Sequence, residues 1–283
     1  MPACSRPSAR PEAMNAGDSP PTVALVGCGR LGSAILEGWL KTGAVEARDL
    51  ILWTPSEKPA AESARAQGAR INPPAAALAG ARALVLAVKP AKWREALAPL
   101  AAGLGPDAVV VSVMAGVAAA DIRSVAERPV ARIMPTTAVA QGRGVAALWC
   151  DEPGAREIAR GLFSAIAEVV DLDLEAQIDA ATATAGSAPA FIYAFVRALA
   201  QAGEAEGLTG EAATRLARGA LRSAGAEVGA GDTLEALIAR IASPGGTTRA
   251  GLDAMAETGD LERAAGTAVR AAAQRARNVQ RVK

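Results

Sequence analysis

Two glycine-containing stretches of this chain have the residue types and spacing of anion-binding sites. The first is Gly27-x-Gly29-x-x-Gly32, which follows an apolar run and opens a helical pattern, and the second is SPGGTT at residues 243–248. Unpaired N–H groups and the helix dipole at a helix start attract negative charge, and glycine lets a ligand approach the backbone. We expect a substrate carboxylate at the second stretch, beside two threonine hydroxyls, although such a turn can also be only a helix start.

The first stretch has the pattern of a dinucleotide site. Gly27 permits a tight turn, Gly29 lets a pyrophosphate contact the backbone, and Gly32 allows the helix to pack closely on the strand. Arg30 and Leu31, which lie between the last two glycines, complete the expected site. The alternative interpretation is a glycine-rich turn without a ligand.

The residues after the second predicted strand bear on the choice of dinucleotide. That strand ends at Trp53, and no acidic residue stands where an NAD ribose would need one. Thr54, Ser56 and Lys58 are there instead, with hydroxyl and ammonium groups suited to a 2′-phosphate. We therefore expect NADPH, with NADH as the alternative; the competing interpretation is that these side chains only solvate a loop.

Two further segments follow predicted strands, at the edge of the sheet where ligands bind in such folds. They are Val88-Lys89-Pro90 and Ala115-Gly116, and we place both along the path of the nicotinamide. Lys89 is a candidate catalytic lysine or a residue that contributes only its backbone, because a proline follows it and no acidic partner is near in sequence.

The composition excludes several kinds of site. Among 283 residues there is no histidine, which removes His-based triads, His-containing zinc sites and imidazole catalysis, and we expect no metal. A net charge of +1 argues against nucleic acid and anionic membranes as partners. Three widely spaced cysteines and the absence of a long apolar run predict a cytoplasmic protein.

Short β-branched runs alternate with alanine-rich segments from Thr22 onward, which is typical of βαβ units and a parallel sheet. Strands are predicted at residues 23–26, 50–53, 83–87, 109–112, 130–133 and 145–148, and helices start near Leu31, Ala60, Ala91, Val117 and Gly154.

After Asp171 the 3.6-residue helical period replaces the strand pattern. Helices are predicted at 190–206, at 211–228, at 232–241 with Asp232 and Glu235 as a capping box, from the SPGGTT motif to about Glu257, and from Asp260 to the C-terminus. We expect a disordered leader at 1–21, a nucleotide-binding domain at 22–172 and a helical domain at 173–283.

Six motifs stand in order along the chain. They are GCGRLGSAI from Gly27, AVKP from Ala87, SVMAGV from Ser112, ARIMPTT from Ala131, IDAATATAGSAPAF from Ile178 and SPGGTTRAGL from Ser243. Together they resemble the motifs of the pyrroline-5-carboxylate reductase family, and the last two are the most specific. The resemblance covers nearly all of the chain after the leader.

This resemblance implies an α/β fold, with an N-terminal Rossmann-type doubly wound sheet and an all-helical C-terminal domain that forms a homodimer, often within a larger ring. It implies hydride transfer from NAD(P)H to the cyclic imine 1-pyrroline-5-carboxylate, giving L-proline in the last step of its biosynthesis. In the family, the loop matching Ser243, Gly245, Gly246 and Thr247 binds the substrate carboxylate through backbone N–H groups. The threonine matching Thr248 contacts the ring nitrogen, so Thr248 is the candidate catalytic residue.

Three positions depart from the family's pattern. The usual SGSGPA reads AGSAPA, with Ala185 and Ala188 replacing a serine and a glycine, and Thr136 replaces an asparagine. We expect these changes near the substrate and cofactor, where they bear on rate and substrate identity. Ser187 is either a ligand or a helix cap.

Other functions are considered beside this one. A larger, six-membered imino acid is one alternative, since one methylene is worth only about 1–3 kcal/mol of discrimination. A catalytically silent, nucleotide-binding paralogue is another. A β-hydroxyacid dehydrogenase would need a catalytic lysine in the helical half, and residues 173–276 contain none.

Overall fold

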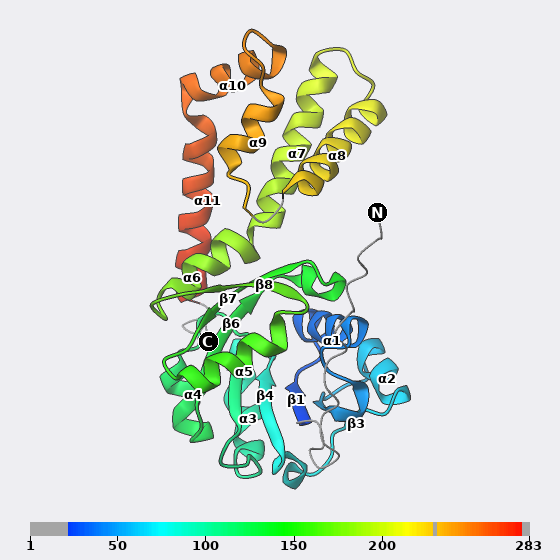
Figure 1. The fold of residues 1–283 in the computed structure, drawn as a ribbon, viewed down its shortest axis with the longest axis vertical. Coiled ribbons are helices and arrows are strands. Elements are labelled where there is room, and N and C mark those ends of the chain that lie inside the picture. The colour runs from blue at the N-terminus through cyan, green and yellow to red at the C-terminus, as the bar shows by residue number, and fades with distance from the viewer. Residues whose placement is uncertain (1–21, 229–230, 279–283) are drawn as a thin grey trace, which may run out of the picture.

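Alternating apolar runs and helical segments build the first half of the chain into one eight-stranded sheet with helices on both faces (Figure 1). The computed structural model describes residues 22–228 and 231–278, so the predicted leader, with Cys4, lies outside the described residues. The strands lie in the order β3-β2-β1-β4-β5-β6-β7-β8. Their bounds are β1 Thr22–Val26, β2 Leu50–Trp53, β3 Arg70–Ile71, β4 Ala81–Leu86, β5 Val109–Ser112, β6 Val130–Pro135, β7 Gly144–Trp149 and β8 Ala167–Asp171.

Successive side chains of each strand point to opposite faces of the sheet and supply two separate cores. Leu25 and Val85 belong to the first core, and their chain neighbours Val26 and Leu84 belong to the second. The first core is covered by α1 (Arg30–Thr42), α2 (Pro59–Ala66) and α5 (Pro153–Phe163), and the second by α3 (Trp93–Ala101) and α4 (Ala119–Ala126). The predicted doubly wound arrangement is confirmed.

The expectation of an all-parallel sheet is wrong at one pairing. Strands β6 and β7 run antiparallel, with Arg132 opposite Trp149, whereas the other pairings are parallel. A parallel pairing needs a long crossover connection. Only a short segment containing the 3₁₀ helix Thr137–Gln141 joins β6 to β7, so the chain returns as a hairpin.

The second half is helical, as predicted. It consists of α6 (Gln177–Ala181), a π-helical segment (Thr182–Gly186), α7 (Ala188–Ala205), α8 (Gly210–Glu227), α9 (Leu234–Ile241), α10 (Thr247–Thr258) and α11 (Asp260–Arg277). Neither α6 nor the π-helical segment is among the predicted helices. A stretch of alanine and threonine has no apolar stripe from which a helical period can be identified.

The capping box predicted at Asp232 is wrong in detail, and of the two alternatives for Ser187 the helix cap lacks its hydrogen bond. The Thr233 hydroxyl oxygen, and not Asp232, accepts a hydrogen bond from the Ala236 N–H at 3.1 Å at the start of α9. Asp232 instead accepts one from the Arg240 guanidinium at 2.6 Å. Ser187 stands at the N-cap of α7, but its side chain makes no cap hydrogen bond.

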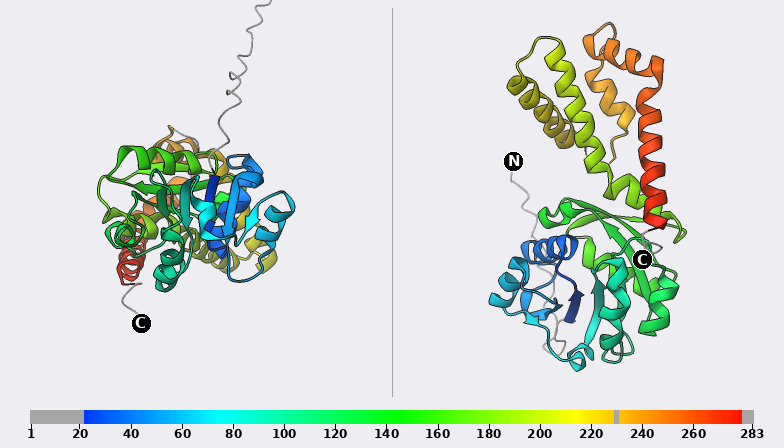
Figure 2. Two further views of the ribbon diagram at one scale, coloured as in Figure 1. Left: turned by 90° about the horizontal axis from the view of Figure 1, so that it is seen from below. Right: turned by 180° about the vertical axis from the view of Figure 1, so that it is seen from behind.

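The helical half stands on the sheet where α6 contacts β6 and β7, and it extends away from the nucleotide-binding half (Figures 1 and 2). Helix α11 returns from the far end to pack against α6 and the π-helical segment. Among the described residues of this half, the buried apolar side chains other than Ile178 are all alanines: Ala183, Ala200, Ala213, Ala217, Ala242, Ala273 and Ala276. No helix in the described ranges has the length and apolar character needed to cross a membrane.

Candidate functional site

The glycine turn after β1 has the backbone geometry that its sequence predicts. Gly27 has a φ of +100°, and a Cβ there would lie 2.8 Å from the Ala87 carbonyl oxygen. A Cβ on Gly32 would lie 1.9 Å from the Gly27 carbonyl oxygen, so the start of α1 approaches the turn as closely as glycine permits. A Cβ on Gly29 would meet no protein atom within 4 Å. The space beside Gly29 is therefore available to a ligand.

The start of α1 offers a positive field to that space. Gly29 is its N-cap and provides no side-chain cap, so the first N–H groups, including those of Arg30 and Leu31, are open to an anion. The Arg30 side chain is exposed. Burial raises the pKa of the Cys28 thiol to about 11, and the positive charge of Lys58 opposes that rise.

A cavity of about 710 Å³ adjoins the turn at the ends of β1 and β2. Its walls include Trp53, Pro55, Val88 and Leu100. Apolar walls beside a phosphate-binding turn suit the base of a nucleotide. The cavity thus supports the expected adenine end of a dinucleotide.

The loop after β2 is held by a residue that sequence patterns do not single out. The Asn72 side-chain amide accepts a hydrogen bond from the Thr54 N–H and donates one to the Thr54 carbonyl, both at 2.9 Å. The Thr54 hydroxyl donates to the Ser56 carbonyl oxygen at 2.8 Å, and Thr54 is buried. The hydroxyl proton of Thr54 is therefore already used in this hydrogen bond, which counts against Thr54 as a hydrogen-bond donor to a phosphate. Ser56 is exposed and Lys58 half-buried, so both stay available.

The AVKP and SVMAGV motifs lie at the ends of the neighbouring strands β4 and β5. The Ala87 N–H donates to the Val26 carbonyl at 2.8 Å, which places Val88, Lys89 and Pro90 next to the glycine turn. Lys89 is exposed, and its side chain has no hydrogen-bond or ion-pair partner within residues 22–228 and 231–278, while its carbonyl oxygen accepts from the Lys92 N–H at 2.8 Å. The turn at Ala115 and Gly116 follows β5, with a φ of +69° at Gly116.

The SPGGTT motif has the geometry of an open helix start. Gly245 has a φ of +70°, the Gly246 N–H donates to the Ser243 carbonyl oxygen at 3.0 Å, and α10 begins at Thr247. Thr247 and Thr248 are exposed. Helix α10 lies at the end of the helical half farthest from the sheet (Figure 1). Within one chain, the motif is therefore not brought to the cofactor turn.

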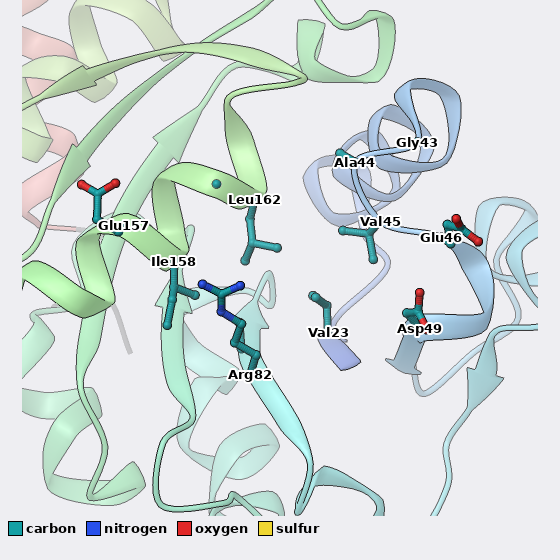
Figure 3. A pocket seen from close by; sticks show the side chains of 12 residues that line it. Val23, Gly43, Ala44, Val45, Glu46, Asp49, Arg82, Glu157, Ile158 and Leu162 are labelled. Atoms are coloured by element: carbon teal, nitrogen blue, oxygen red, sulfur yellow. The ribbon is translucent and has the colours of Figure 1, made fainter. Parts of the chain in front are cut away.

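A second cavity, of about 360 Å³, lies at the opposite edge of the sheet (Figure 3). The Arg82 side chain extends between Ile158 and Val23, with Glu157 on one side of the cavity and Glu46 and Asp49 on the other, beyond Val23. The C-terminal ends of α1 and α5 also contribute to its lining. Helix C-termini and carboxylates favour a cation, so this cavity does not suit a phosphate.

Thr136, Ala185 and Ala188, which depart from the family's pattern, lie at the end of a strand and in helical segments. Thr136 is buried at the end of β6, and its hydroxyl oxygen accepts a hydrogen bond from the Val145 N–H of β7 at 3.3 Å. Its hydroxyl thus helps to close the hairpin. Ala185 lies within the π-helical segment, and Ala188 is the first residue of α7.

Comparisons with known proteins cover both halves. Residues 175–279 match the family described as "Pyrroline-5-carboxylate reductase dimerisation", and residues 22–116 match "NADP oxidoreductase coenzyme F420-dependent". Among solved structures, pyrroline-5-carboxylate reductase from Coxiella burnetii has a TM-score of 0.81 at 24% identity, covering 92% of this chain and 99% of that one. The Plasmodium falciparum enzyme with NADP bound has a TM-score of 0.75 at 22% identity, covering 93% and 100%.

Curated relatives extend the likeness to the sequence. Pyrroline-5-carboxylate reductase of Mycobacterium tuberculosis is 33% identical over 282 residues, covering 89% of this chain and 95% of the relative. The Pseudomonas aeruginosa enzyme is 33% identical over 264 residues, covering 91% of this chain and 96% of that one. With this identity over nearly its whole length, a doubly wound nucleotide-binding half and a matched helical half, the chain belongs to the pyrroline-5-carboxylate reductase family.

Proposed function

We propose that this protein reduces 1-pyrroline-5-carboxylate to L-proline with NADPH. One hydride passes from the nicotinamide to the imine carbon, and one proton is added at the ring nitrogen. The observation that carries the proposal is that a chain of this family keeps both anion sites, the glycine turn after β1 and the open start of α10. The first suits a dinucleotide pyrophosphate and the second an imino-acid carboxylate.

The chain's own residues supply position and charge, while NADPH supplies the hydride. Gly29 and the start of α1 bind the pyrophosphate, and Ser56 and Lys58 bind the 2′-phosphate. The segments at Val88–Pro90 and Ala115–Gly116 flank the nicotinamide half. No histidine is available to polarise the imine nitrogen.

At the other site, backbone N–H groups of the SPGGTT motif bind the substrate carboxylate, and the Thr248 hydroxyl donates a hydrogen bond to the ring nitrogen. A protonated or hydrogen-bonded imine accepts hydride more readily, because hydride attack on carbon moves the C=N electron pair onto nitrogen, where a proton or a donor stabilises it. Fixing the carboxylate presents the imine carbon to the nicotinamide.

A homodimer through the helical half would complete the site. Leu234 and Ile241 of α9 are 66% and 67% exposed. Other large apolar side chains on α7 and α8, such as Tyr193 and Leu216, are exposed as well. Large apolar side chains exposed together on several helices of one half favour a protein interface there. A second copy would cover it and bring its own SPGGTT motif toward the cofactor.

A spectrophotometric assay of NADPH oxidation tests this function. We expect turnover with 1-pyrroline-5-carboxylate, formation of L-proline, and a higher kcat/KM with NADPH than with NADH. The six-membered cyclic imino acid serves as the competing substrate. A higher kcat/KM for the six-membered ring would overturn the substrate, and NADPH binding without proline formation would overturn the reaction.

A further inference from the structure

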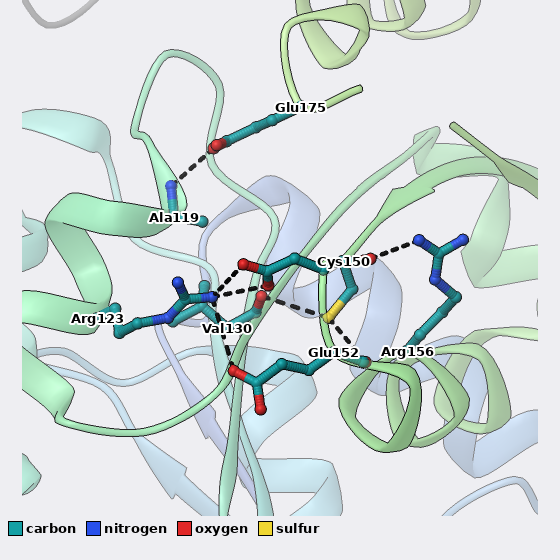
Figure 4. Close-up of polar contacts among 8 residues, drawn as sticks. Ala119, Arg123, Val130, Cys150, Glu152, Arg156 and Glu175 are labelled. Carbon is teal, nitrogen blue, oxygen red and sulfur yellow. Dashed lines mark hydrogen bonds and ion pairs between the residues drawn. The ribbon is translucent and has the colours of Figure 1, made fainter. Parts of the chain in front are cut away.

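One carboxylate, that of Glu175, connects the two halves of the chain. Its Oε1 atom accepts a hydrogen bond from the Ala119 N–H at 2.7 Å, at the start of α4 (Figure 4). The same oxygen accepts a hydrogen bond from Nη1 of Arg132 on β6 at 3.0 Å. Glu175 lies between β8 and α6, where the chain passes into the helical half. Within the described ranges, the hydrogen bonds and ion pairs between residues 22–172 and 173–278 all involve this side chain.

Arg132 also contacts the segment after β5, at the end of the sheet where we place the cofactor. It is 5% exposed, and its Nη2 donates to the Met114 carbonyl oxygen at 3.3 Å. Met114 directly precedes Ala115 and Gly116, the turn after β5 that we place beside the nicotinamide. Arg132 therefore binds the carbonyl of Met114 just before this turn, and Glu175 binds the N–H of Ala119, the first residue of the helix after it.

Of this pair, Arg132 is buried and Glu175 is half-buried, with side chains 6% and 26% exposed. Removing the Arg132 charge from water is costly, and apolar side chains of similar volume often stabilise a fold as well or better. Arg132 also leaves its buried Nε without a partner among the described residues. A role in fixing one arrangement of the chain therefore explains the pair better than its contribution to stability does.

The adenine end of the cofactor site is independent of this pair. The turn at Gly27–Gly29, the Asn72-held loop and Lys58 lie at the ends of β1 and β2, and none of them has a hydrogen bond to Arg132 or Glu175. The contacts of the pair instead fall on the segment after β5. Any effect on the cofactor should therefore be confined to its nicotinamide half.

We propose that Arg132 and Glu175 are positioning residues that hold the Met114–Gly116 turn in place against the nicotinamide and tie it to the helical half. The proposal rests on the proposed function in taking that turn as the nicotinamide side. The new element is that one side chain, that of Glu175, sets both the orientation of the helical half and the position of the turn beside the nicotinamide.

Two ligands separate this role from general stabilisation. NADPH occupies both ends of the cofactor site, whereas adenosine 2′,5′-bisphosphate occupies only the adenine end. For Glu175→Ala we expect NADPH affinity to fall about tenfold, the loss expected for a charged hydrogen bond. Affinity for adenosine 2′,5′-bisphosphate should stay within about twofold of wild type, since its contacts remain.

Matched variants complete the experiment. Glu175→Gln retains an acceptor oxygen for both donors and should recover most of the NADPH affinity. Asp151→Ala removes the ion pair between Arg123 and Asp151, at 2.7 Å, which involves neither the linker nor the turn. It should leave the affinity for both ligands unchanged.

Two results would overturn the proposal. In one, Glu175→Ala lowers the affinity for both ligands equally, and in the other it lowers the affinity for neither. If Glu175→Ala does not fold, Glu175→Asp, whose shorter side chain cannot reach both donors, is compared with Glu175→Gln in the same way. These binding measurements need no imine substrate. A wild-type protein that binds NADPH but forms no proline contradicts the proposed function and still leaves the ratio of affinities as the test of positioning.

Discussion

At the scale of single residues, Asn72 holds the loop that carries the proposed 2′-phosphate ligands. Its φ of +49° is in the left-handed region, which asparagine tolerates better than most residues. From there its amide pairs with both backbone groups of Thr54 and fixes the loop that carries Ser56 and Lys58. Asn72 also lines the cavity that we assign to the adenine end, so it is placed to act on cofactor choice through the position of this loop.

The variant Asn72→Gly removes this pairing and still suits a positive φ. We expect its KM for NADPH to rise about threefold to tenfold, the effect of losing hydrogen bonds worth about 1 kcal/mol each in net terms. Its KM for NADH, which has no 2′-phosphate, should change less. Initial-rate kinetics with both cofactors check this, and an equal rise for the two would show that the loop has no part in selectivity.

The Thr248 hydroxyl carries the proposed hydrogen bond to the ring nitrogen. Thr248→Ala should lower kcat by about 10²-fold, if the hydroxyl acts in the transition state, and leave NADPH affinity unchanged. Thr248→Ser keeps the hydroxyl and should keep most of the activity. Steady-state kinetics and a cofactor titration measure both, and an unchanged kcat in the alanine variant removes Thr248 from the mechanism.

At the scale of elements, the close approach of α1 to the 3₁₀ helix after β6 sets the geometry of the cofactor end. A Cβ on Gly38 would lie 2.2 Å from the Val139 carbonyl oxygen. The same helix begins at the glycine turn, so a displaced α1 would also displace the pyrophosphate site. Gly38 stands outside the Gly27–Gly32 pattern, and its role was not predicted.

Gly38→Ala should therefore lower the free energy of unfolding by about 1–3 kcal/mol through overpacking. Gly161→Ala in α5 is the matched control, because a Cβ there meets no atom within 4 Å. In a helix, that change should stabilise by about 0.5–1 kcal/mol. Thermal melts of both variants compare the two, and equal melting temperatures would mean that α1 shifts freely.

The sequence predicts elements well where a local pattern defines them. The apolar runs of β2 and β5 have the predicted bounds, and Gly27, Gly29 and Gly32 are identified by spacing alone. The direction of β7 is not encoded in an apolar run, and β3 has only two residues.

The site residues that were missed or misassigned depend on contacts between distant residues. Asn72, which follows β3, forms hydrogen bonds with Thr54, which follows the neighbouring strand β2. Glu175 of the helical half forms an ion pair with Arg132 of the sheet. The sequence predicts the Thr54 hydroxyl as a cofactor ligand, because nothing in the sequence shows that this hydroxyl donates to the Ser56 carbonyl oxygen. Such pairings need the folded chain.

At the scale of the whole molecule, the helical half cannot be stabilised by its own core alone. Alanine buries little apolar area, so the cluster of Ala200, Ala213 and Ala217 contributes little burial free energy. The large apolar side chains of this half, such as Ile241, are the exposed ones. The stability of α9 and α10 should therefore depend on protein concentration, as it does in obligate dimers.

Ile241→Glu places a charge on one of the most exposed large apolar positions of this half. We expect analytical ultracentrifugation to show dissociation toward monomers, because a charge in an interface core is costly. Turnover should fall with it, while NADPH binding persists. Gln67→Glu, at an exposed position of the nucleotide-binding half, adds the same charge and should leave the assembly intact. A dimer that survives Ile241→Glu would place the interface elsewhere.

The distance between the glycine turn and α10 within one chain has a genetic consequence. A variant defective only at the turn, such as Gly29→Asp, and one defective only in α10, Thr248→Ala, should complement each other when co-expressed. Each mixed dimer would contain one site built from two intact halves and one built from two damaged halves. Random pairing makes half of the dimers mixed, so activity should return to roughly a quarter of wild type. Two lesions in one and the same chain would give no such recovery.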